Sequence, residues 1–215
     1  MFLPQPRFTA FLLLLLACKT PLALAAEPGA IEFNQVLKLG DTCPAWNDLP
    51  GTDGQKHSLS ELKDVPVVVV VFTCNTCPTA TDYEGRILDL IKHNDSANAG
   101  KVKLVAINVN KVAGDSLADM TARAKDKGLT YSYLYEETQQ IAKQYGAITT
   151  PQFFVLDSGR KLDYTGALDD ATDPKAAKVN YVQTAIDAAL AGKTPEVTSI
   201  PPRGCLIRFA RERKK

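Results

Sequence analysis

Buried apolar runs and amphipathic stretches alternate along the middle of the chain. Residues 67–72 form an unbroken β-branched and aromatic run, which predicts a strand that is covered on both faces. Apolar residues at helical spacing over 80–91 predict a helix next, and Pro78 is tolerated in its first turn. A second apolar run over 102–109 predicts another buried strand. Together these segments predict a β-α-β unit.

The later elements continue this alternation and close with a β-hairpin and a helix. Periodicity and capping residues predict a helix that ends at Gly128, a strand over 131–135, a helix over 138–145, a hairpin of strands 152–156 and 161–164, and a last helix over 179–190. Asp115 or Ser116 is expected to cap the first of these helices, and Asp173 the last. The order predicts an α/β fold whose mixed central sheet is flanked by helices on both faces.

The first 26 residues have the pattern of a secretory signal peptide. Arg7 supplies a positive flank, residues 11–17 form a short apolar run, and Ala23-Leu24-Ala25 is a small-x-small cleavage pattern. The run is far shorter than the ~20 residues that a membrane-spanning helix needs. A buried N-terminal helix is the alternative interpretation. We expect the mature chain to be exported, periplasmic or secreted, and not transmembrane.

The chain is expected to divide into a signal peptide over 1–26, one domain over 27–192 and a tail over 193–215. A turn cluster over 50–54 predicts a small hairpin near the start of the domain. The tail is rich in proline and arginine and is expected to be solvated and frayed at its end. A lipid anchor at Cys18 is the less favoured alternative to simple cleavage.

Composition and charge narrow the classes of partner that the protein is expected to bind. The formal net charge is +1, and removal of the two basic residues of the signal peptide leaves 23 basic against 24 acidic residues. Such a balance gives no reason to expect a nucleic-acid partner or a membrane-binding patch. Four cysteines remain after Cys18, an even number that fits disulfide chemistry outside the cytosol.

Cys74 and Cys77 stand where the first buried strand gives way to its helix. A cysteine at a helix N-terminus meets unpaired backbone N–H groups, which favour the thiolate. The spacing of three places the two side chains close enough for a disulfide. We expect Cys74, nearer the exposed tip, to attack substrates and the deeper Cys77 to resolve the mixed disulfide.

The Cys74–Cys77 pair also allows other interpretations. A zinc site needs two more ligands; His57 and His93 are isolated, and only Cys43 with Cys205 offers a remote route to four cysteines. No metal and no other cofactor is therefore expected. An inert structural disulfide is the more serious alternative, although it leaves the strand-to-helix position unexplained.

The region over 67–166 resembles the redoxin branch of the thioredoxin superfamily, similar to alkyl hydroperoxide reductase and thiol-specific antioxidant proteins. The matching segments are Thr73-Cys74-Asn75-Thr76-Cys77-Pro78, residues 137–146, Thr150-Pro151 and residues 154–159. The resemblance implies a thioredoxin-like fold with Pro151 in the cis conformation against the redox pair, and Thr150 offering backbone groups to a substrate. It also implies that Cys74 forms the mixed disulfide with that substrate.

The expected activity is thiol-disulfide exchange with protein or small-molecule disulfides, together with a partner that recycles the pair. A thiol peroxidase is the first alternative, but its Pro-x-x-x-Thr-x-x-Cys pattern is absent, since Val70 and Cys74 fill the positions before Cys77. A copper-binding thiol protein is the second, and it lacks a histidine near the closing hairpin. No buried acid is found in the strand before Cys74 to accept a proton.

Cys43 and Cys205 lie outside the redox pair, one before the N-terminal hairpin and one in the tail. Because the ends of compact domains often lie close together, a structural disulfide between them is expected. One alternative makes Cys205 a third redox thiol that resolves Cys74 and leaves Cys43 spare; another leaves both thiols unpaired, which an oxidising compartment disfavours.

Overall fold

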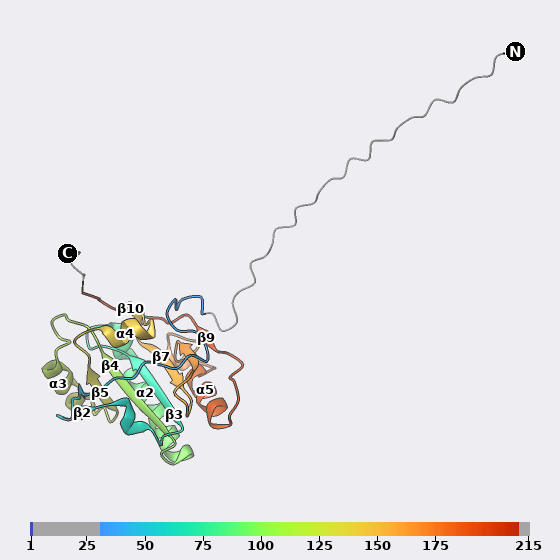
Figure 1. Cartoon of the computed structure of the whole chain (residues 1–215). Coiled ribbons are helices and arrows are strands. Elements are labelled where there is room, and N and C mark those ends of the chain that lie inside the picture. Colours follow the sequence, from blue (N-terminus) through green and yellow to red (C-terminus); the bar gives the residue numbers. More distant parts are fainter. Residues whose placement is uncertain (2–30, 211–215) are drawn as a thin grey trace.

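A six-stranded mixed sheet forms the centre of the protein (Figure 1). The computed structural model describes Met1 and residues 31–210, so the expected signal peptide and the Cys18 alternative lie outside the described residues. The strands are β1 (Leu49–Pro50), β2 (Lys56–His57), β3 (Val67–Phe72), β4 (Val102–Asn108), β5 (Ser132–Tyr135), β6 (Thr149–Thr150), β7 (Gln152–Leu156), β8 (Leu162–Gly166), β9 (Ser199–Ile200) and β10 (Cys205–Leu206). The helices are α1 (Pro78–Asp82), α2 (Glu84–Asn98), α3 (Leu117–Lys127), α4 (Gln140–Tyr145) and α5 (Tyr181–Leu190), with short 3-10 turns η1 (Leu59–Leu62) and η2 (Pro174–Ala176).

The sheet has the order β5-β4-β3-β7-β8-β9. β3 runs parallel to β4 and antiparallel to β7, and β7 forms the predicted hairpin with β8. β1 and β2 form the small N-terminal hairpin, and β6 pairs with β10 outside the main sheet. The α/β fold with a mixed sheet is therefore confirmed.

Alternate side chains of β3 serve two apolar layers, as expected for a central strand. Val68, Val70 and Phe72 pack with α4 and the N-terminal segment on one face. The other set of β3 side chains, at positions 67, 69 and 71, packs against α2, α3 and α5. This two-sided burial explains the continuous apolar run, and it fixes the position of the residues that follow β3.

Around this frame, the structure corrects two sequence predictions and decides between the two candidate caps of α3. The single helix expected after β3 is two helices, α1 and α2, which meet at Tyr83. Ser116 caps α3, with its side chain accepting from Asp119 N–H. Asp173 caps only η2, and Asn180 caps α5. The predicted stop of α3 at Gly128 is confirmed, because Gly128 ends the helix in the left-handed conformation.

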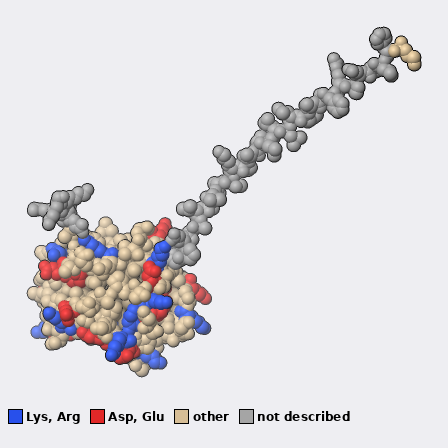
Figure 2. All heavy atoms as spheres, viewed as in Figure 1, with Lys and Arg blue, Asp and Glu red and all other residues tan. Residues whose placement is uncertain are grey.

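The tail differs most from its prediction. Two short segments of the tail pair with the domain: β9 extends the sheet beside β8, and β10 pairs with β6. Most of the end that was expected to be frayed, residues 208–215, lies outside the described residues. Acidic and basic side chains are interspersed over the face seen in Figure 2, in line with the nearly neutral composition. Within the described part of the chain, no helix has the length and apolar character needed to cross a membrane.

Candidate redox site

The segment 73–77 leaves the carboxyl end of β3 and turns into α1. Pro78 occupies the first turn of α1, where its missing N–H costs nothing, so the helix starts at Pro78 and Cys77 is its N-cap. The sulfur of Cys77 accepts a hydrogen bond from Ala80 N–H at 3.4 Å. The N-terminal thiol of the helix is therefore Cys77. The prediction that Cys74 stands at an exposed helix tip is wrong, since Cys74 lies three residues before the cap and is only 3% exposed.

Both sulfur atoms contact the same residue, Thr150. The Cys74 Sγ lies 3.4 Å from Thr150 Oγ1, and the Cys77 thiol donates to the Thr150 carbonyl oxygen at 3.1 Å. The Thr150-Pro151 peptide bond is cis, as the resemblance implied. Thr150 belongs to β6 and follows α4, so two separate parts of the chain meet at the pair. The structure thus brings together the four site residues Cys74, Cys77, Thr150 and Pro151.

Asp115 holds the loop between the two cysteines. Its carboxylate Oδ1 accepts from the backbone N–H groups of Asn75 (2.7 Å) and Thr76 (3.3 Å), and Oδ2 accepts from the Thr76 hydroxyl (2.6 Å). Asn108 and Asn110 at the end of β4 donate their side-chain amides to the same carboxylate, each at 3.2 Å. Asp115 is fully buried, and hydrogen bonds rather than a cation neutralise its cost of burial.

Sequence reasoning considered Asp115 only as a helix cap. Its signal was its position in the segment between the second buried strand and the next helix. The carboxyl ends of parallel β3 and β4 meet at one edge, so residues after β4 lie beside the loop after β3. This is the buried acid that the strand before Cys74 lacks. No carboxylate–sulfur hydrogen bond joins Asp115 to Cys74; the charge acts on the thiol through space.

The two thiols of the pair have opposite electrostatic environments. Burial raises the pKa of Cys74, and the negative charge of Asp115 raises it further against the hydrogen bond from Thr150. Burial also opposes ionisation of Cys77, but hydrogen bonds from the Cys205 thiol and from Ala80 N–H outweigh it, and the pKa of Cys77 lies below its ordinary value. Cys77 is therefore the sulfur that carries negative charge most readily.

The C-terminal segment covers this pair. In the register of β10 with β6, Cys205 stands opposite Thr150. The interaction of its thiol with Cys77, followed by burial, raises the pKa of Cys205 to about 11. Cys205 itself is exposed to solvent, whereas Cys77 is 2% exposed.

The expected disulfide between Cys43 and Cys205 is not formed, and all four described cysteines are free thiols. Cys43 is buried in the apolar layer on the far side of β3 from α2, and its backbone N–H donates to Arg160. Burial, followed by the charge of Asp157, raises the pKa of Cys43 to about 12. Cys205 is held elsewhere by its pairing with Thr150, so the two residues belong to different sites.

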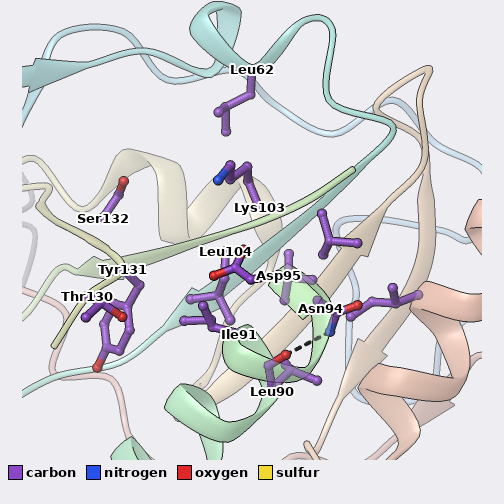
Figure 3. A pocket seen from close by; sticks show the side chains of 13 residues that line it. Leu62, Leu90, Ile91, Asn94, Asp95, Lys103, Leu104, Thr130, Tyr131 and Ser132 are labelled. Carbon is purple, nitrogen blue, oxygen red and sulfur yellow. Dashed lines mark hydrogen bonds between the residues drawn. The ribbon is translucent and has the colours of Figure 1, made fainter. Parts of the chain in front are cut away.

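A cavity of about 330 Å³ lies apart from the thiols (Figure 3). It is lined by residues from the amino-terminal halves of β3 and β4 and from the end of α2, with Asn94 and Lys103 among its polar groups. None of the residues around the sulfur atoms lines it. Among the described residues, no group of three or more His, Cys, Asp or Glu side chains is arranged to hold a metal ion.

Comparison with known proteins gives one matching family and two solved structures of similar sequence identity to this chain. The AhpC/TSA family matches residues 39–165. A hypothetical protein from Sinorhizobium meliloti is 32% identical, with a TM-score of 0.74; the match covers 83% of this chain and 98% of that one. An uncharacterized conserved protein from Geobacillus kaustophilus is 31% identical, with a TM-score of 0.75, and the match covers 84% and 96% of the two chains.

A more distant structure has the same fold and a named class. Peroxidoxin BcpB from Mycobacterium tuberculosis is 22% identical, with a TM-score of 0.53; the match covers 72% of this chain and 95% of that one. This likeness confirms the thioredoxin-like fold. No curated protein matches the chain.

Proposed function

Because the chain belongs to the AhpC/TSA family, a family of thiol redox proteins, we propose that it is a thiol-disulfide oxidoreductase that works through Cys74 and Cys77. The observation that carries this proposal is the contact of both sulfur atoms with Thr150, beside the cis Pro151. Two thiols three residues apart, one on the hydroxyl and one on the carbonyl oxygen of the same threonine, are placed to exchange a disulfide between themselves and with a third sulfur.

In the proposed reaction, Cys77 attacks first. The thiolate is the nucleophile in disulfide exchange, and the hydrogen bonds to Cys77 favour its thiolate over that of Cys74. Attack on a substrate disulfide joins Cys77 to one substrate sulfur and releases the other as a thiolate. Cys74 then attacks Cys77, which closes the Cys74–Cys77 disulfide and releases the second substrate thiol. One disulfide is reduced and one is formed, so two electrons pass from the protein to the substrate.

Asp115 positions this chemistry without touching the sulfur atoms. Its hydrogen bonds fix Asn75 and Thr76, the two residues that set the distance between the cysteines. Its negative charge disfavours a second thiolate at Cys74, so the proton stays on Cys74 until the mixed disulfide has formed. Asp115 is therefore a positioning residue.

Reduction of insulin disulfides with dithiothreitol as the electron source tests the proposal. Cys77→Ser is expected to abolish turnover, and Cys74→Ser to slow it. Cys43→Ser, which alters a buried cysteine outside the pair, serves as the matched control and should keep the wild-type rate. Peptide mapping of the oxidised wild-type protein should find a Cys74–Cys77 disulfide. An unchanged rate in Cys77→Ser would refute the proposal.

Peroxide reduction is the second candidate, favoured by the position of Cys77 at the helix cap with a lowered pKa. The absence of the peroxidase threonine and proline at positions 74 and 70 places it behind disulfide exchange. Hydrogen peroxide consumption by the reduced protein distinguishes the two. Rapid oxidation of Cys77 to the sulfenic acid, with no insulin reduction, would reverse the order.

The proposed setting is an exported protein with a separate partner that recycles its thiols. N-terminal sequencing of the mature protein tests the first point, and a start near residue 26 is the expected result. The reduction potential of the Cys74–Cys77 pair tests the direction of electron flow. A value near about −270 mV indicates a reductant, and one near about −120 mV an oxidant.

A further inference from the structure

The segment 199–210 brings a third sulfur to the redox pair. β10 pairs with β6, which places Cys205 opposite Thr150, the residue that both Cys74 and Cys77 contact. The Cys205 thiol lies near enough to Cys77 to lower the pKa of Cys77, and the backbone N–H of Thr79 in α1 lies near the Cys205 sulfur. The N-terminus of α1 therefore lies beside both Cys77 and Cys205, the two sulfurs between which the exchange is proposed.

Contacts on both sides of Cys205 hold this segment in place. Before it, the Arg203 guanidinium donates to the backbone carbonyl of Asp169 and lies 3.6 Å from the Asp169 carboxylate. After it, the buried Ile207 donates its backbone N–H to Ile148 at 2.9 Å. Gly204 passes so close to β6 that a Cβ atom there would lie 2.0 Å from the Thr150 carbonyl oxygen. The position of Cys205 is thus specified by its neighbours in the chain.

The three thiols differ in their exposure to solvent. Cys74 and Cys77 are 3% and 2% exposed beneath β10, whereas Cys205 is open to solvent. With β10 in place, a large partner can reach the sulfur of Cys205 but not those of the pair. The neighbouring Leu206 is 73% exposed and offers an apolar contact beside this sulfur.

We propose that Cys205 is a third redox thiol, which forms a disulfide with Cys77 and passes oxidation state between the buried pair and a partner protein's dithiol or disulfide. This inference rests on the proposed function and adds the route by which a partner reaches the pair. It applies to the Cys77–Cys205 contact, not to the exchange with Cys74 that was considered from the sequence.

The first step is internal and needs no other reagent. In the oxidised protein, the Cys205 thiolate attacks the sulfur of Cys77; the Cys77–Cys205 bond forms and the Cys74–Cys77 bond breaks. Cys74 leaves as a thiolate and takes up the proton that Cys205 has lost. One disulfide and one thiol are present before and after the step, so no electrons leave the protein.

The second step exchanges with the partner. A partner thiolate attacks the exposed sulfur of Cys205, and Cys77 leaves as a thiolate. The second partner thiol then attacks the partner sulfur of this mixed disulfide, which forms the partner disulfide and releases Cys205. Two electrons have passed from the partner dithiol to the protein, and the reverse sequence reduces a partner disulfide.

Attack at Cys205 is favoured for two reasons. Its sulfur is the accessible one, and the leaving group is Cys77, whose sulfur accepts a hydrogen bond from Ala80 N–H at the N-terminus of α1. A thiol of lower pKa leaves faster from a disulfide. Attack at Cys77 instead would require the partner to reach a sulfur whose residue is only 2% exposed. The arrangement therefore directs the partner to the surface sulfur.

Disulfide mapping of full-length Cys74→Ser tests the contact directly, with oxidised glutathione as the probe. The expected product is a Cys77–Cys205 disulfide in the monomer, with no glutathione retained. The matched control, Cys43→Ser, should give the Cys74–Cys77 disulfide under the same conditions. A stable mixed disulfide of glutathione with Cys77 beside a free Cys205 would overturn the inference.

Rates with substrates of different size separate the inference from the proposed function. Cys205→Ser should slow insulin reduction by about tenfold or more, because the accessible sulfur is lost, and should affect oxidised glutathione much less. If Cys205→Ser reduces both insulin and oxidised glutathione at the wild-type rate while Cys77→Ser is inactive, the inference is overturned and the proposed function stands. If every cysteine variant, Cys77→Ser included, keeps the wild-type rate of exchange, the proposed function is refuted.

Discussion

Replacing Asp115 by asparagine tests the structural basis of the site, because the change alters one charge and little volume. Five donors converge on the carboxylate in the native protein, three on Oδ1 and two on Oδ2. An asparagine side chain has only one acceptor oxygen, so its NH₂ group must face donors on the other side. If the oxygen keeps the bonds from Asn75 and Thr76 N–H, the NH₂ group faces the Asn110 amide and the Thr76 hydroxyl.

The expected cost is about 3 kcal/mol in the free energy of unfolding. A hydrogen bond to a charged group contributes about 1.5–3 kcal/mol net, and Asp115→Asn loses at least one such bond and weakens the rest. A buried donor left without an acceptor adds a cost of the same order. Urea unfolding should show this as a lower midpoint with an unchanged slope.

A matched control is Asp119→Asn, which removes the same charge from the exposed capping box of α3. Its effect on the unfolding midpoint should be much smaller, because Asp119 is solvated. The pKa of Cys74 provides a second measurement: removal of the Asp115 charge should lower it, as followed by thiolate absorbance. A loss of less than about 1 kcal/mol in Asp115→Asn, with an unchanged Cys74 titration, would refute this account of the loop.

Three further changes probe the covering segment and the pH dependence. Gly204→Ala should displace β10 and speed alkylation of Cys77, whereas Gly85→Ala, which has open space around its Cα, should not. Cys205→Ala removes a hydrogen-bond donor and should raise the pKa of Cys77 in a thiolate absorbance titration; an unchanged titration would contradict the contact. Burial, then the charge of Asp157, raises the pKa of Asp163 to about 6, so its contribution to stability is lost as pH rises from about 4 through 6. Asp163→Asn should remove this pH dependence of stability and stabilise the protein at pH 7 by about 1 kcal/mol, allowing for partial exposure. Chemical unfolding at about pH 4 and at pH 7 measures the difference.

Local signals predicted the frame of the site because the frame is built from long, periodic elements. The six-residue apolar run of β3 is buried on both faces, and no other arrangement suits such a run. The start of α1 could also have been placed better from the sequence. Pro78 is favoured at the first helical position, which makes Cys77, and not Cys74, the capping residue.

Long-range contacts were harder to predict. The role of Asp115 depends on which strands are neighbours, and a single acid before a helix is more often a cap. β10 has only two residues, and its pairing with β6 joins segments more than fifty residues apart in the chain. Neither hydrophobic period nor turn chemistry indicates such a short contact, so the sequence does not predict that the tail reaches β6. A glycine directly before a cysteine was the one local sign of close backbone approach.

The three thiols of the site divide reactivity and access between them in a way that neither property alone explains. Cys77 forms a thiolate more readily than Cys74 but is buried. Cys205 is exposed, but its thiol is more difficult to ionise than that of Cys77. A reduced protein with β10 in place therefore reacts slowly with large disulfides, because the reachable thiol is a poor nucleophile. A protein oxidised at Cys77–Cys205 reacts readily with a partner thiolate, because the reachable sulfur has a good leaving group. Leaving-group stability and exposure act together only in the second case, so we expect the return of electrons from a partner dithiol to be faster than the reduction of a protein disulfide through the same Cys205.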